Sequence, residues 1–166
     1  LTTEGESNGT IIRYNNISNI HRHGIFCGVN HSYVSIIGNT ISFVGHPFDG
    51  NNTYNSNDGI VVNGHGYNIL HNTIHDTMTG DSNLIGVKSW GTVNGNILYN
   101  SRKRAVAFYA QENGYNKPAI IENNIMYNID ANFECVSMGH DVKLVGIIST
   151  ISFGIIRFNT CISRPG

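Results

Sequence analysis

The stretch Ile69-Leu70-His71-Asn72-Thr73-Ile74 contains an Asn that follows one apolar residue by three places and precedes another by two. The same arrangement of apolar residues around an Asn occurs at five other places in the chain. The six Asn residues are Asn15, Asn39, Asn72, Asn96, Asn123 and Asn159. They are separated by 24, 33, 24, 27 and 36 residues. A unit of about 24 residues therefore recurs with insertions, which is typical of a solenoid.

Each copy of this pattern predicts a short strand, a sharp turn and a second strand. Side chains alternate along a strand, so both flanking apolar residues face the same interior. We expect Asn in the turn because it tolerates the left-handed backbone region and bonds to nearby main-chain groups. Stacked turns would place Asn above Asn, with each amide donating to the next, as an Asn ladder of the six residues. The alternative, that Asn merely fills polar loops, leaves the regular Ile, Val and Leu neighbours unexplained.

A looser pattern between the Asn turns predicts a third strand in each coil. The expected inward residues are Ile25, Ile60, Val87, Val106 and Cys135. By alternation, one outward column is predicted to contain Phe26, Val61, Lys88 and Ala107. The next outward column is predicted to contain Gly28, Asn63, Trp90 and Tyr109. Three short strands per coil result.

With three strands per coil, the chain resembles the right-handed parallel β-helix superfamily, the pectate-lyase-like group, from about residue 8 to 163. The resemblance implies an all-β, single domain over residues 1–166, with about six coils, as a whole protein or as a fragment of a longer chain. Polygalacturonases, uronate lyases, mannuronan epimerases and phage tailspikes share this architecture. The repeat describes how coils stack, so the resemblance implies a polysaccharide partner without specifying an activity.

Composition and charge restrict the partners. The net charge of −1 argues against nucleic acid, because phosphate contacts need a basic surface. The longest apolar stretch, 144–156, is thirteen residues and too short for a transmembrane helix. We expect an extracellular or cell-surface location, with a cytoplasmic one as the open alternative. Stacked coils leave unpaired strands at both ends, so association of copies through these ends is also expected.

The candidate site is predicted on the face of the third strands. Insertions at 46–57 and 77–83 are expected to form one wall of a groove, since function often resides on loops held by a rigid scaffold. Lys88, Trp90 and Tyr109 suit an acidic sugar, because aromatic faces stack on sugar rings and a cation pairs with a carboxylate. The predicted substrate-binding residues are Trp90, Asp58, Asn63 and His65. A packing role for Trp90 and a solubilising role for Lys88 remain the alternatives.

Two classes of function stay open. A uronate lyase or epimerase needs a base, for which Lys88, His23 or Tyr109 qualifies, and a cation such as Arg104 to stabilise the developing charge. A hydrolase is less favoured, because the tandem Asp pair of polygalacturonases is missing. The other class is a non-catalytic structural or binding module, such as an adhesin or a tailspike-like scaffold.

Metal and cysteine chemistry are not strongly indicated. Calcium is possible, but no spacing brings its candidate ligands together. Those candidates are Asp49, Asp58, Asp76, Asp81 and Glu134. Two His pairs, His71 with His75 and His21 with His23, lack a convincing third zinc ligand. Finally, Cys27, Cys135 and Cys161 occupy core positions and are interpreted as buried free thiols.

Overall fold

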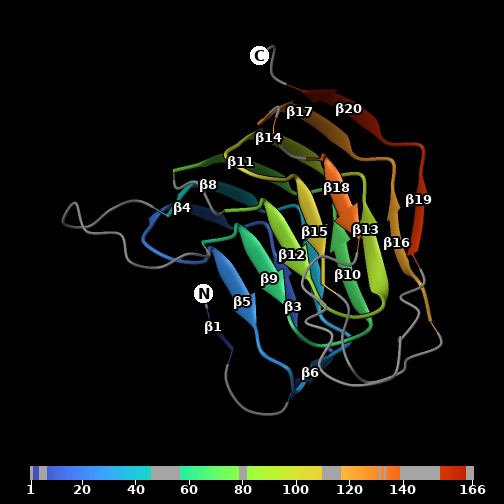
Figure 1. Ribbon diagram of the computed structural model, residues 1–166. Helices are drawn as coiled ribbons and strands as arrows, with labels where there is room; N and C mark the ends of the chain where they lie inside the picture. The colour runs from blue at the N-terminus through green and yellow to red at the C-terminus, as the bar shows by residue number, and fades with distance from the viewer. Residues whose placement is uncertain are drawn as a thin grey trace, which may run out of the picture.

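The computed structural model describes residues 2–3, 7–45, 57–78, 82–109, 117–130, 132, 134–138 and 154–163. Within these ranges the chain is all-β, with three six-stranded sheets and one pair of short strands (Figure 1). This confirms the prediction of an all-β chain whose parallel strands stack in three sheets. Residues 46–56 of the first insertion and 79–81 of the second lie outside the described residues, and so does the groove wall that the insertions were expected to form.

The first sheet contains β1 (Thr2–Thr3), β5 (Ile25–Cys27), β9 (Ile60–Val62), β12 (Ile85–Val87), β15 (Val106–Phe108) and β18 (Val136–Met138). The second sheet contains β3 (Ile11–Arg13), β7 (Ser35–Ile37), β10 (Tyr67–Leu70), β13 (Gly91–Asn94), β16 (Ala119–Glu122) and β19 (Gly154–Arg157). The third sheet contains β4 (Asn16–Ile20), β8 (Thr40–Val44), β11 (Thr73–Thr77), β14 (Ile97–Ser101), β17 (Ile125–Ile129) and β20 (Thr160–Ser163). The short pair is β2 (Ser7–Asn8) with β6 (His31–Ser32).

The chain visits the second, third and first sheets in turn and then returns to the second sheet one layer further along. Every pairing between neighbouring layers in the three large sheets is parallel; β10, for example, pairs with β7 on one side and with β13 on the other. Figure 1 shows β5, β9, β12, β15 and β18 side by side in the order in which the chain reaches them. This arrangement is consistent with a parallel β-helix solenoid.

The core lies between the three sheets and consists of stacked aliphatic residues. Ile36 and Ile69 of the second sheet pair in register, as do Ile41 and Ile74 of the third, and all four side chains are fully buried. Each buried Ile contributes about 1.5–3 kcal/mol relative to an exposed one. The apolar residues that flank Asn39 and Asn72 therefore lie in the core between the sheets.

Two-residue corners join the second sheet to the third. The first residue of each described corner is left-handed, with φ between 54° and 66°. These residues are Tyr14, Gly38, His71, Gly95, Asn123 and Phe158. The second residue is an Asn whose side chain bonds along the solenoid axis. We call the set Asn15, Asn39, Asn72, Asn96, Asn124 and Asn159 the asparagine row.

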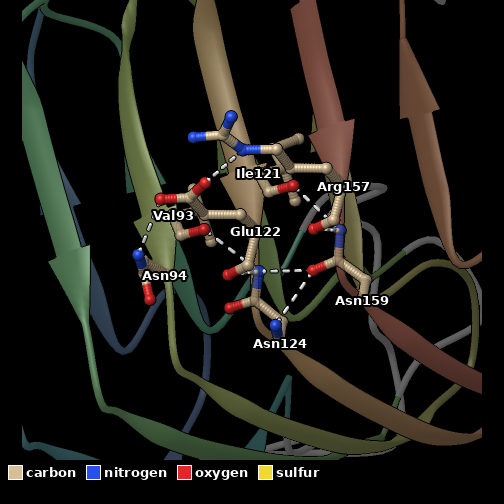
Figure 2. A network of polar contacts seen from close by, with 7 residues as sticks. All are labelled: Val93, Asn94, Ile121, Glu122, Asn124, Arg157 and Asn159. Carbon is tan, nitrogen blue, oxygen red and sulfur yellow. Dashed lines mark hydrogen bonds and ion pairs between the residues drawn. The ribbon is translucent and has the colours of Figure 1, made fainter.

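Hydrogen bonds connect the asparagine row from layer to layer. The Nδ2 of Asn72 donates to Oδ1 of Asn96 at 3.0 Å and to the carbonyl of Ile36 at 2.9 Å. The backbone N–H of Asn72 also donates to Oδ1 of Asn96, at 2.8 Å. Figure 2 shows the last members, with Asn124 donating to Asn159 through both its backbone N–H and its Nδ2, at 2.9 Å each. Each amide thus satisfies main-chain groups that would otherwise be buried without partners.

The placement of Asn123 corrects one prediction. Asn123 is exposed and adopts the left-handed conformation, and it is Asn124, 1% exposed, that bonds to Asn96 and Asn159. The predicted turn had a single Asn with both properties, the left-handed backbone and the stacked amide. The corner divides them between two successive residues.

The register of the first sheet corrects a second prediction. Gly86, not Lys88, pairs with Val61 and Ala107 in the first outward column. Lys88 follows the strand, in the layer between Asn63 and Tyr109, because its N–H donates to Val62 and the N–H of Tyr109 donates to Val87. The inward column likewise contains Ile85 in place of Val87 and Val136 in place of Cys135.

The cysteines correct a third prediction. Cys27 is a buried free thiol, as expected, but Cys135 and Cys161 form a disulfide, with Cα atoms 6.3 Å apart. Cys161 pairs in register with the inward-facing Met126, and Cys135 immediately precedes β18 in that neighbouring layer. Both side chains point into the same end of the solenoid, which is why they meet.

Candidate functional site

A row of polar side chains lies at the edge where the first sheet begins. Each member stands two residues before an inward-facing residue of the sheet, so the parallel register places them in successive layers. The members are His23, Asp58, Asn83, Arg104 and Glu134. We call them the edge row. Three of the predicted site residues, His23, Asp58 and Arg104, therefore lie in one line.

Asp58 and Asn83 form the buried centre of the edge row. The backbone N–H of Asn83 donates to Oδ1 of Asp58 at 2.7 Å, and its Nδ2 donates to the same oxygen at 3.2 Å. Nδ2 also donates to the hydroxyl of Tyr109 at 2.9 Å. Asp58 and Asn83 are 2% and 1% exposed, so these bonds form away from bulk water. Asn83 thereby couples a carboxylate to a half-buried phenol.

Gly86 makes room for this cluster on the outer face of the first sheet. A Cβ at Gly86 would lie 2.7 Å from Oδ2 of Asp58 and 3.4 Å from Cε2 of Tyr109. The carboxylate and the phenol ring therefore cover the glycine. A larger residue here would displace the Asp58 carboxylate.

His23 occupies one end of the edge row as a neutral imidazole. Burial, reinforced by the positive charge of Arg22, lowers its pKa from 6.5 to about 4. Its Nδ1 accepts the backbone N–H of Asp58 at 3.2 Å, and its ring stacks on Phe26 with centroids 5.5 Å apart. At neutral pH the remaining proton is therefore on Nε2, which makes Nε2 a donor.

Arg104 lies beyond Asn83 in the edge row and is paired. Its Nε donates to Oε2 of Glu134 at 3.1 Å. Arg104 is only 6% exposed, whereas the Glu134 side chain is 60% exposed. The guanidinium is thus a buried charge held by a partly solvated carboxylate, in a layer next to Asn83.

A second cluster forms at the corner that joins the first sheet to the second. Trp90 contacts His65 with ring centroids 5.6 Å apart and Tyr33 edge-on at 5.9 Å. Gly66 permits this contact, because a Cβ there would lie 2.9 Å from both Trp90 and Tyr33. The Nε2 of His65 also bonds with Oγ of Ser32 at 3.1 Å. We call Tyr33, His65, Trp90 and Lys117 the aromatic corner.

Lys117 brings positive charge to the aromatic corner. Its Nζ lies 4.2 Å from the centroid of the Trp90 ring, within the range of a cation–π interaction. Tyr67 fixes the backbone nearby, because its buried hydroxyl donates to the carbonyl of Ser89 at 2.7 Å. Burial raises the pKa of Tyr67, so it stays a donor. Ser89 lies between Lys88, which follows β12 of the first sheet, and Trp90 of the aromatic corner. The corner therefore adjoins the end of the first sheet.

The structure groups the predicted site residues differently from the expectation. Asp58 and Tyr109 meet through Asn83, and Trp90 meets His65, but Trp90 lies at the corner and not in the column of Asn63 and Tyr109. Sequence reasoning missed Asn83, Tyr33 and Lys117. Asn83 could have been found from its position immediately before the Leu84-Ile85 pair. No local sequence pattern around Lys117 indicates its position beside Trp90.

A third group of rings lies on the outer face of the third sheet. His75 stacks on Tyr99 at 4.6 Å and Tyr99 on Tyr127 at 4.8 Å, with interplanar angles of 3° and 5°. His75 also bonds through Nδ1 to Oδ2 of Asp76 at 2.7 Å. Because these rings cover one another's faces, Tyr99 has no open face for a sugar. We interpret this stack as a packing feature.

The second sheet carries a charged network on its outer face. Glu122 accepts from Nδ2 of Asn94 at 2.9 Å and from Nε of Arg157 at 2.6 Å (Figure 2). It links three successive layers beside the asparagine row. Both oxygens of Glu122 are thus bonded to neighbouring layers, so the network supports stacking.

In the described ranges of the chain, no three His, Cys, Asp or Glu side chains are grouped to hold a metal ion. Of the calcium candidates, Asp49 and Asp81 lie outside the described residues. The same ranges contain no helix with the length and apolar character to cross a membrane.

Comparison with known proteins gave no relatives. No protein-family model, no curated protein and no solved structure matches this chain.

Proposed function

We propose that the chain is a right-handed parallel β-helix of about six coils, related to the pectate-lyase-like superfamily, with the asparagine row as its Asn ladder. Two observations support this: the parallel register of the three sheets, and amide bonds repeated in every layer from Asn15 to Asn159. Right-handed connection is the rule for parallel strands in one sheet.

We propose that this β-helix binds an acidic polysaccharide across the aromatic corner and the adjoining end of the first sheet. The observation that carries the proposal is the position of Lys117 over Trp90, next to Tyr33 and His65. Tyr33 is 55% exposed and offers an open ring to the apolar face of a sugar. Lys117, which is exposed, and Lys88, which is half-buried, supply ammonium groups for uronate carboxylates.

The experiment is a calorimetric titration of the purified chain with oligogalacturonate and oligomannuronate, and with neutral dextran as the control ligand. We expect Lys117→Ala and Tyr33→Ala each to weaken binding by about 3- to 30-fold, the range expected for a cation–π or stacking contact. Binding should also weaken as salt rises. Equal binding of dextran would contradict the preference for an acidic sugar.

The chain offers a matched pair of control variants. Tyr14 is exposed and left-handed, with φ 57° against 56° for Tyr33, and the Arg13 guanidinium lies 6.0 Å from its ring. Tyr14→Ala and Arg13→Ala therefore remove the same kinds of group with a similar backbone effect on the second sheet. If these variants weaken binding as much as those at Tyr33 and Lys117, the aromatic corner is not the site.

A second candidate function, a uronate lyase or epimerase, is favoured by the Asp58–Asn83–Tyr109 cluster. The Tyr109 hydroxyl oxygen accepts a hydrogen bond from Nδ2 of Asn83, which stabilises the phenolate form that a base requires, so Tyr109 is the base we favour among the three proposed. Arg104, in the next layer after Asn83, would stabilise the developing charge. Formation of an unsaturated uronide, abolished by Tyr109→Phe with binding retained, would establish this activity. Binding without turnover would indicate a carbohydrate-binding module. The absence of both binding and turnover would favour a structural rod.

We propose an extracellular or cell-surface location. The Cys135–Cys161 disulfide supports this, because disulfides persist in oxidising compartments.

A further inference from the structure

The Cys135–Cys161 disulfide joins two neighbouring layers of the solenoid. Cys135 precedes β18, which follows β16 and β17 in the chain, and Cys161 lies within β20. The two residues are 26 positions apart, so the bond closes a loop that contains β19. The disulfide therefore ties the β19–β20 layer to the layer before it.

Among the described residues, the apolar side chains of the β19–β20 layer are less buried than those of the layer before it. Ile155 and Ile156 are 40% and 48% exposed, and Ile162 is 59% exposed. In the preceding layer, Ile121 and Met126 are fully buried. Segments with few buried apolar side chains open at a small fraction of the global unfolding free energy. Among the described residues, strand pairing, the Asn159 amide, the Arg157–Glu122 ion pair and the disulfide therefore restrain this layer.

The disulfide is open to attack, and the third cysteine is not. Cys161 is exposed and Cys135 half-buried, whereas Cys27 is 0% exposed. Thiol–disulfide exchange requires access of a thiolate to one of the two sulfurs. A small dithiol can therefore reduce this bond while the rest of the chain stays folded.

We propose that the Cys135–Cys161 disulfide is a redox-controlled latch that keeps the β19–β20 layer on the solenoid. A dithiol thiolate attacks one sulfur and forms a mixed disulfide, and its second thiol then closes a ring, leaving two cysteine thiols and the oxidised dithiol. Two electrons pass from the dithiol to the cystine. Once the bond is broken, β19 and β20 separate readily, and the edges of β16 and β17 become available for pairing with another strand.

Hydrogen exchange on the full chain, with and without dithiothreitol, tests the latch. The chain-entropy relation for a loop of this length predicts an opening constant larger by on the order of 10²-fold after reduction. We expect this increase at the amides of β19 and β20, whose pairings include Thr160 N–H to Asn124 O at 2.9 Å. The amides of β12 to β15 should keep their protection. Unchanged protection of β19 and β20, or an equal loss throughout the chain, would overturn the proposal.

Two variants complete the test. Cys161→Ser should show the exchange of the reduced protein and no response to dithiothreitol, and Cys27→Ser should respond as the unmodified chain does. If Cys161→Ser fails to fold, pulsed exchange in the first minutes after reduction of the unmodified chain gives the same readout. Alkylation in denaturant should modify one cysteine before reduction and three after it. Three modified cysteines before reduction would also overturn the proposal.

Discussion

Replacement of Asn96 by Ala removes one member from the middle of the asparagine row. Asn96 is fully buried, and its Oδ1 accepts both the N–H and the Nδ2 of Asn72, at 2.8 and 3.0 Å. Its own Nδ2 donates to the carbonyl of Ile69 and to Oδ1 of Asn124, both at 2.9 Å. In the variant, the Asn72 N–H loses its buried acceptor, whereas Oδ1 of Asn124 keeps the backbone N–H of residue 96, at 3.0 Å, and loses only the side-chain donor.

The expected loss follows from the cost of such orphaned groups. The buried N–H without a partner costs about 1–3 kcal/mol and each further lost hydrogen bond about 0.5–1.5 kcal/mol, so we expect a loss of about 2–5 kcal/mol in the free energy of unfolding. Urea unfolding followed by circular dichroism measures this difference. Asn68→Ala is the matched control, because Asn68 is exposed on the outer face of β10 and should change stability by less than about 0.5 kcal/mol.

A second pair of variants tests the register of the row. Asn124→Ala should cost about as much as Asn96→Ala, whereas Asn123→Gly should be near neutral because glycine accepts a φ of 55° without strain. If Asn96→Ala and Asn68→Ala differ by less than about 1 kcal/mol, the row does not stabilise the fold. If Asn123→Gly is as costly as Asn124→Ala, the assignment of the two Asn residues is wrong.

Two further predictions concern the edge of the first sheet. A Cβ at Gly59 would lie 2.5 Å from Cγ2 of Ile74 and 2.6 Å from the carbonyl oxygen of Leu84. Gly59→Ala should therefore lower the stability measured by thermal unfolding by about 1–3 kcal/mol. Gly28→Ala should not, because the nearest atom to a Cβ there, Cδ2 of His31, is 3.5 Å away. His23 has a folded pKa of about 4 and an unfolded value of 6.5, so the unfolded chain binds its proton first and stability should fall as the pH drops from 6.5 to about 4. Denaturation midpoints measured across this range should fall less in His23→Gln, and an identical slope in both proteins would contradict the shift.

The strands on both sides of the asparagine row were predictable because their apolar residues alternate around a constant Asn. The choice between Asn123 and Asn124 was not. Apolar residues stand three places before and two places after each of them, so the pattern fits both. Only the stacking of amides in three dimensions distinguishes them.

The candidate site was harder to predict for a related reason. The third strand of the Lys88 segment was placed two residues out of register. A shift of two leaves every side chain on its original face, so alternation cannot detect it. The aromatic corner depends on Lys117, which follows Trp90 by 27 residues and shows no periodic relation to it. The Cys135–Cys161 disulfide was not predictable either, because it depends on the directions in which the two Cβ atoms point.

The bonds of the asparagine row all run in one direction. Each Nδ2 donates toward the next layer, from Asn15 to Asn39 at the start and from Asn124 to Asn159 at the end. The amide dipoles therefore add along the axis, with the carbonyl pole at Asn15 and the N–H pole at Asn159. Two solenoids that continue this row across their ends must meet head to tail. Head-to-tail contacts between identical rods do not close on themselves, so such an assembly would grow as a filament and not stop at a dimer.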